Sequence, residues 1–210
     1  MSGYKDFVAG DPLTAAQVDG YLMRQSVMVF ASATARNAAL SGVLVEGMHA
    51  YCVDLGITGS PAGLTVYDGS AWVIQWSEWA AYTPAWTALT VGNGTYANCK
   101  YRYLAGSIEV HGKLTFGSTT SISGVVFQTV PDSASIDSPE KMPLGHVLLS
   151  DITGSNVPGR ALGYTATTVW FIGEFSTGSA PNYINSTTAT LPFTWATGDI
   201  VYWNYSAPLA

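Results

Sequence analysis

The stretch from Glu46 to Val73 constrains the fold of this chain most, because it predicts three short β-strands in close succession. Residues 48–54 and 64–67 are rich in aromatic and β-branched side chains, which favour strands. Asp68-Gly69 is a typical tight-turn dipeptide, and the third run follows it at Trp72. A meander of this size is marginally stable alone, so another layer or a partner must cover its apolar face.

The segment before the meander predicts an extended arm followed by short helices. Thr14 and Gln17 have the spacing of a capping box, in which each side chain satisfies a free backbone N–H at the start of a helix. Residues 27–30 favour a brief strand. Ser32 or Thr34 can then cap a second helix, so the helical content is confined to short pieces near the N-terminus.

The remainder of the chain predicts an antiparallel β-sandwich with a jelly-roll-like fold. Its clearest strand spans residues 107–116, where apolar side chains alternate with polar ones such as His111. Residues 163–175 predict another long strand, and residues 191–205 predict a terminal hairpin. Residues 131–160 hold four prolines and little periodicity, which predicts loops of the kind that often carry binding surfaces.

Four tryptophans lie between residues 72 and 86, where the meander meets the sandwich. Trp72, Trp76 and Trp79 have helical spacing. We interpret this segment as a packed collar rather than a sugar-stacking platform, because large aromatics usually supply core and interface area. The predicted fold is therefore mainly β, in three parts: an arm with short helices at 1–45, the meander and collar at 46–80, and the sandwich at 81–210.

Charged residues make up only 10% of the chain, against roughly 25% in an average soluble domain. A surface so poor in charge suggests that sister subunits cover much of it. The net charge of −6 and the scattering of only eight basic residues argue against a nucleic-acid partner. The sequence shows neither a signal peptide nor an apolar run of about 18 residues, so we expect synthesis in a cytosol and no membrane insertion.

The sequence offers little sign of catalytic or metal chemistry. It has no GxSxG motif, and His49, His111 and His146 lie far apart with no HExxH pair. Cys52 and Cys99 predict two buried, reduced thiols rather than a disulfide or a metal site. We expect no cofactor and no enzymatic activity, although a carboxylate pair for glycoside hydrolysis could come from five acids: Glu109, Glu140, Asp151, Glu174 and Asp199.

Three segments, VMVFASATARNAAL, EGMHAYCVDLG and LTVYDGSAWV, resemble a module of tailed-bacteriophage virion proteins, especially minor tail and fibre proteins. YTPAWTALTVGNGTY and TLPFTWATGD are similar to the C-terminal β-sandwich of phage tail and receptor-binding proteins. The resemblance covers nearly the whole chain after about Met28. It implies a homotrimer whose N-terminal region docks to the particle and whose β domain faces outward, and it brings no enzymatic residues. The long shaft of a typical fibre has no counterpart in this sequence.

We therefore expect a structural protein of the virion, assembled in the host cytoplasm: a homotrimeric minor tail protein or short fibre that contacts host-surface glycans. A capsid decoration protein or head fibre that stabilises the shell is the main alternative, and a virion-associated polysaccharide hydrolase is a third. Three copies of the meander can bury one another's apolar faces around a threefold axis. Tyr67, Trp72 and Trp86 are the residues predicted to lie near that axis. The glycan-binding residues are not identified by the sequence.

Overall fold

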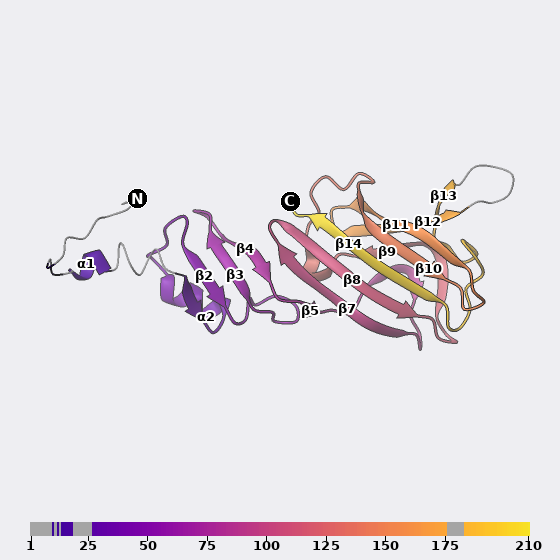
Figure 1. The fold of residues 1–210 in the computed structure, drawn as a ribbon, viewed down its shortest axis with the longest axis horizontal. Coiled ribbons are helices and arrows are strands. Elements are labelled where there is room, and N and C mark those ends of the chain that lie inside the picture. The colour runs from indigo at the N-terminus through magenta and orange to yellow at the C-terminus, as the bar shows by residue number, and fades with distance from the viewer. Residues whose placement is uncertain (1–9, 11, 13, 19–26, 176–182) are drawn as a thin grey trace. The chain divides into compact units, whose positions relative to one another are not determined.

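A computed structural model describes residues 10, 12, 14–18, 27–175 and 183–210 of the chain (Figure 1). The chain divides into two compact units, Met1–Glu78 and Trp79–Ala210. Taken as a whole, the described part of the chain is mainly β, as the sequence predicts. None of the helices in the described part of the chain is long and apolar enough to cross a membrane.

Two short helices form in the first unit where the capping residues predict them. Helix α1 (Ala15–Gln17) follows Thr14, whose hydroxyl accepts from Gln17 N at 3.3 Å while the Gln17 side chain accepts from Thr14 N at 3.0 Å. Helix α2 (Ala33–Leu40) is capped by Ser32, which accepts from Ala35 N at 3.1 Å. Both caps satisfy backbone N–H groups that have no partner inside the helix.

The first unit also contains the predicted meander. Its strands are β2 (His49–Cys52), β3 (Gly63–Tyr67) and β4 (Trp72–Ser77), which pair antiparallel in chain order. The brief strand predicted at 27–30 is β1 (Met28–Phe30), and it adds to the sheet parallel to β2. Because Trp72 and Trp76 belong to β4, the helical interpretation of their spacing is wrong. Pairing with β3 decides the local structure there.

One face of this small sheet is covered by α2. Ala50, Cys52 and Thr65 point to that side and are almost fully buried. Arg36 of α2 donates through Nη1 to the Thr65 hydroxyl at 2.9 Å, and its guanidinium lies 4.4 Å from the centre of the Trp72 ring. Burial lowers the pKa of Arg36. The helix is thus fastened to the sheet by a buried cationic group as well as by apolar packing.

The second unit is an antiparallel sandwich formed by one long sheet that folds over on itself. The strand order along the sheet is β7-β8-β14-β10-β11-β12-β9-β6, with β5 beside β7 and β13 beside β12. The strands are β5 (Ala80–Ala81), β6 (Trp86–Thr90), β7 (Thr95–Leu104), β8 (Ser107–Thr115), β9 (Ser121–Thr129), β10 (Pro143–Ser150), β11 (Asn156–Thr165), β12 (Thr168–Phe175), β13 (Tyr183–Ser186) and β14 (Ile200–Pro208).

The alternation predicted for residues 107–116 is confirmed in β8, where Ile108, Val110 and Leu114 are buried. Other expectations for this unit are wrong in detail. The supposed loop region 131–160 contains β10 and the start of β11, because both pair with long neighbouring strands despite their prolines. The single strand expected at 163–175 is a tight β11–β12 hairpin. Of the terminal hairpin, only the second arm, β14, is a long strand.

Trp203 of β14 occupies the centre of the sandwich and touches both layers. Its indole N–H donates to the Tyr82 hydroxyl at 2.9 Å, and its ring meets that of Trp86 edge to face at 5.3 Å between centroids. Phe171 of β12 lies 6.3 Å away on the opposite layer. The cross-strand partner of Trp203 is Gly112, and a Cβ added there would lie 2.2 Å from the indole. Because Gly112 has no side chain, the Trp203 indole can occupy the space beside it.

We predict that Gly112→Ala lowers the free energy of unfolding by about 1–3 kcal/mol, because the added methyl group overpacks the core against a large ring. Gly124→Ala is the matched control: it lies on β9, and its Cβ would meet only Ala88 at an ordinary 3.5 Å. That variant should stay within about 0.5 kcal/mol of the wild type. Urea denaturation of both variants measures the difference. If the two variants lost the same unfolding free energy, the claim that Trp203 requires a glycine at position 112 would be contradicted.

Candidate functional site

The outer face of the sandwich carries a row of polar side chains that crosses five strands. Paired register aligns Lys100 of β7, His111 of β8, Asn204 of β14, His146 of β10 and Arg160 of β11. Neighbouring strands are separated by about 4.8 Å, so the row extends over about 19 Å. We call these five residues the histidine row. The sequence gives no local signal of it, because the members come from five separate segments.

The histidine row and its surroundings gather much of the positive charge of this acidic chain. Four of the eight lysines and arginines lie on this face, namely Lys100, Arg102, Lys113 and Arg160. Two of the three histidines lie there too. The description of the basic residues as scattered therefore holds for the sequence but is wrong for the fold, because antiparallel pairing brings distant positions together.

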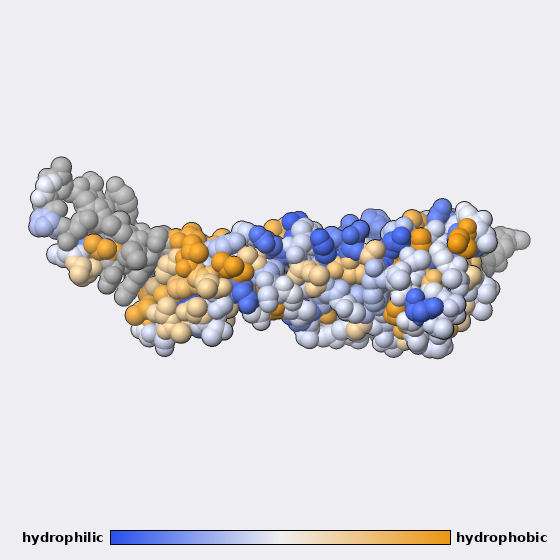
Figure 2. Space-filling view, turned by 90° about the horizontal axis from the view of Figure 1, so that it is seen from below, coloured by the Kyte–Doolittle hydropathy of each residue, from blue (hydrophilic) through white to orange (hydrophobic). Residues whose placement is uncertain are grey.

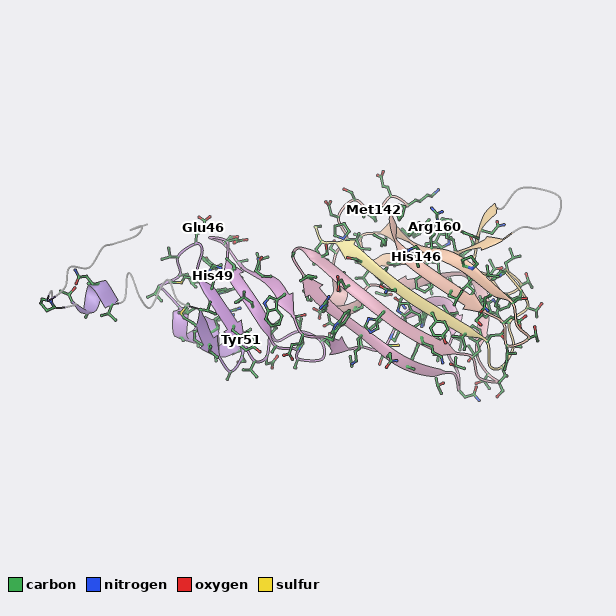
Figure 3. The ribbon with its side chains drawn as sticks, in the orientation of Figure 1. Glu46, His49, Tyr51, Met142, His146 and Arg160 are labelled. Carbon is green, nitrogen blue, oxygen red and sulfur yellow. The ribbon has the colours of Figure 1, made fainter. Side chains whose placement is uncertain are left out.

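Two shallow pockets lie on this face and share His146. The first has a volume of about 390 Å³ and includes His111, Lys113, Tyr202 and Asn204 in its lining. The second, of about 410 Å³, extends from His146 to Arg160 and Glu174. Figure 3 shows His146 and Arg160 on the adjacent strands β10 and β11. Together the pockets form a groove along the histidine row.

Aromatic rings border the groove at its β8 end. Trp79 packs against the His111 imidazole, with 4.5 Å between ring centroids, and the Arg102 guanidinium lies 4.6 Å from the Trp79 ring. Tyr202 lies beside Lys113, whose ammonium is 5.5 Å from the ring centre. Both Trp79 and Tyr202 remain exposed. Flat, exposed rings next to amide and cationic groups are suited to a polar ligand with an apolar face.

His111 is held toward its neutral form. Burial lowers its pKa, and the positive charges of Lys100 and Arg102 lower it further, while Glu109 acts in the opposite direction. Glu109 accepts from Arg102 Nε at 2.6 Å, so much of its charge is already matched. At neutral pH the imidazole therefore offers a hydrogen-bond donor and an acceptor rather than a fixed charge.

A second surface of interest is the face of the small sheet opposite α2, which we call the open face. Register places Val29, Tyr51, Leu64 and Trp76 on it in one row across the four strands. Val29 is 70% exposed and Trp76 is 38% exposed. Figure 2 shows hydrophobic side chains gathered on the first unit, whereas the sandwich surface is mostly polar in this view.

The three residues predicted to line a trimer axis fall in different places. Tyr67 and Trp72 pack together, with 5.5 Å between ring centroids, at one end of the α2-covered face. Trp86 belongs to the second unit, where it contacts Phe171 and Trp203 and donates to the Tyr96 hydroxyl. Their interface role stays a prediction.

The open face was not predicted from the sequence. Successive side chains of β2, β3 and β4 point to opposite faces, and this alternation could have identified the residues that lie opposite α2.

Four of the acids considered for hydrolysis make structural contacts. Glu109 and Glu174 pair with Arg102 and Arg160. Asp199 is fully buried and accepts from Ile152 N at 2.9 Å and from Ala196 N at 2.6 Å, which fixes the loop before β14. Asp151 accepts from the Thr153 N–H and hydroxyl. These acids serve the fold in this structure.

Cysteine and histidine side chains are common metal ligands, and the chain has two cysteines and three histidines. Cys52 and Cys99 are both buried free thiols, and burial raises the pKa of each. Within the described ranges, no group of three or more His, Cys, Asp or Glu side chains is arranged to hold a metal ion.

Comparison of the chain with models of protein families, with curated proteins and with solved structures finds no match.

We predict that part of the stability of the sandwich is lost on acidification through His111. Its folded-state pKa is lowered, so its contribution is present above the unfolded value of about 6.5 and is lost as the pH falls toward the folded value. Urea midpoints measured at about pH 7.5 and about pH 5 should differ less in His111→Gln than in the wild type. An identical pH dependence in the two proteins would contradict this assignment.

Proposed function

We propose that the chain is a structural protein of a bacteriophage virion, a homotrimeric minor tail protein or short fibre. Its first unit serves assembly and attachment to the particle, and its sandwich contacts glycans of the host surface. The proposal joins the resemblance of the ARNAAL and YDGSAW segments to phage virion modules with two surfaces of the fold, the open face and the groove.

The open face is the observation that carries the proposal. Val29, Tyr51, Leu64 and Trp76 form an uncharged row across it, and His49 and Val66 lie beside this row. Tyr51 and Trp76 already contact each other, with 6.1 Å between ring centroids. A four-stranded sheet with an apolar face left bare is a poor surface for a free monomer, and large apolar patches usually mark interaction sites.

Further copies of the same chain are the occupants that fit this face best. A row without formal charge can meet its own copy without bringing like charges together, which would be costly in a chain of net charge −6. The contact also covers the side of the small sheet that α2 leaves exposed.

We predict that Val29→Glu converts the assembled protein to monomers, because it places three carboxylates in an apolar interface. Val29 is mostly exposed in the single chain, so the fold of the monomer should be kept. Ala39→Glu adds the same charge to the exposed side of α2 and should leave assembly intact. Light scattering should give about three times the 22.2 kDa subunit mass for the wild type and for Ala39→Glu. A wild type that stays monomeric at all concentrations would contradict the proposal.

The virion role is tested on the particles themselves. Gold-labelled antibodies raised against the purified protein should decorate intact phage particles produced by the genome that encodes this chain. Label on the tail supports the minor tail protein or short fibre, whereas label over the shell supports the capsid decoration alternative. Particles that carry no label, and that contain no peptide of this chain by mass spectrometry, would refute a structural role in the virion.

A further inference from the structure

The charges along the groove are unevenly matched. Glu109 pairs with Arg102, and Glu174 pairs with the Nε of Arg160. Lys100 and Lys113 have no such carboxylate partner among the ion pairs of the described residues. The unmatched ammonium group of Lys113 therefore lies in the groove of an acidic protein, and that of Lys100 lies on the next strand, paired in register with His111.

Between these charges lie neutral groups that form hydrogen bonds. Asn204 pairs in register with His111 on one side and His146 on the other. Asn98, at an irregular position of β7 with φ of 53°, also lines the first pocket. Amide and imidazole groups can both donate and accept, which suits them to hydroxyl-rich ligands.

The groove also provides surfaces for stacking. Tyr202 forms part of the first pocket, and Trp79 lies over His111. Both side chains are 38–39% exposed, so a ligand can reach their rings. A sugar ring presents an apolar C–H face and a polar rim, and aromatic rings beside amide groups match both.

We propose that the groove binds an acidic polysaccharide, with its carboxylates directed to Lys113 and Lys100 and its hydroxyls to Asn204 and the two histidines. This inference rests on the proposed glycan contact and specifies its chemical class. A lysine–carboxylate contact is a charge-assisted hydrogen bond, which is stronger than a neutral one. Matched charges within the groove would also favour acidic chains over neutral ones.

A nucleic acid is the less suitable anion for this groove. Its backbone carries a charge at every nucleotide and needs a continuous basic track. Here the unmatched cations are Lys100 and Lys113, and the two arginines are already paired with acids. The net charge of −6 on the chain would repel a polyanion of high charge density.

The test uses the full-length protein and hexagalacturonate, a linear acidic hexasaccharide, with its methyl ester as the neutral probe of the same backbone. Calorimetry should detect binding of the acid and about hundredfold weaker binding of the ester, as expected for the loss of both charge-assisted contacts. Added salt should weaken binding of the acid more than that of the ester.

Lys113→Gln is the informative variant, because it removes one unmatched charge from a partly exposed position. It should bind hexagalacturonate about tenfold more weakly and the ester unchanged. Lys141→Gln removes the same charge from an exposed residue outside both pockets and should bind both probes as the wild type does. Unchanged thermal midpoints establish that the variants are folded.

Three results would overturn the inference. Equal affinity for the acid and its ester would remove the charge preference while leaving glycan contact in place. Equal loss of affinity in Lys113→Gln and Lys141→Gln would show that binding reflects overall charge and not the groove. Tighter binding of an oligothymidylate than of hexagalacturonate would assign the groove to nucleic acid. The virion role is judged separately by the gold labelling, so it can stand or fall independently of these results.

Discussion

The packing of Trp203 against Gly112 is the contact on which the sandwich depends. It requires a glycine in the middle of β8, where the strand would otherwise carry a side chain, and it places an indole between the two layers. The hydrogen bond to Tyr82 and the edge contact with Trp86 then tie the start of the second unit to its last strand. Trp203 belongs to β14, which also supplies Tyr202 and Asn204 to the groove on its outer face.

The two units differ in where their apolar and polar side chains are exposed. The first unit covers one side of its sheet with α2, anchored by the buried Arg36, and carries on the other side the uncharged row of the open face, with His49 beside it. The second unit keeps its apolar side chains inside and presents paired ions, histidines and amides outside. The proposed assembly through the first unit and ligand contact through the second are based on this division. The row of residues at which copies are proposed to meet therefore contains no charged side chain.

Local patterns in the sequence predicted the parts of the fold that local forces decide. The cap at Ser32, the Asp68-Gly69 turn and the alternation in β8 were all correct, because each depends on neighbouring residues. Strand β10 was missed, since its pairing with β11 and β14 comes from distant segments. The histidine row could not be predicted for the same reason: its alignment exists only once the register of five strands is fixed. The open face was within reach, because side chains two apart in a strand share a face.

The central claim is that the open face is covered in the native protein, and hydroxyl-radical footprinting tests it most directly. Trp76 on the open face and Trp79 on the sandwich are 38% and 39% exposed in the single chain, so in a monomer they present equal targets. The account predicts that Trp76 and Tyr51 are protected in the wild type while Trp79 is oxidised, and that Val29→Glu restores oxidation of Trp76. Oxidation of Trp76 in the wild type at the rate of Trp79 would contradict the claim.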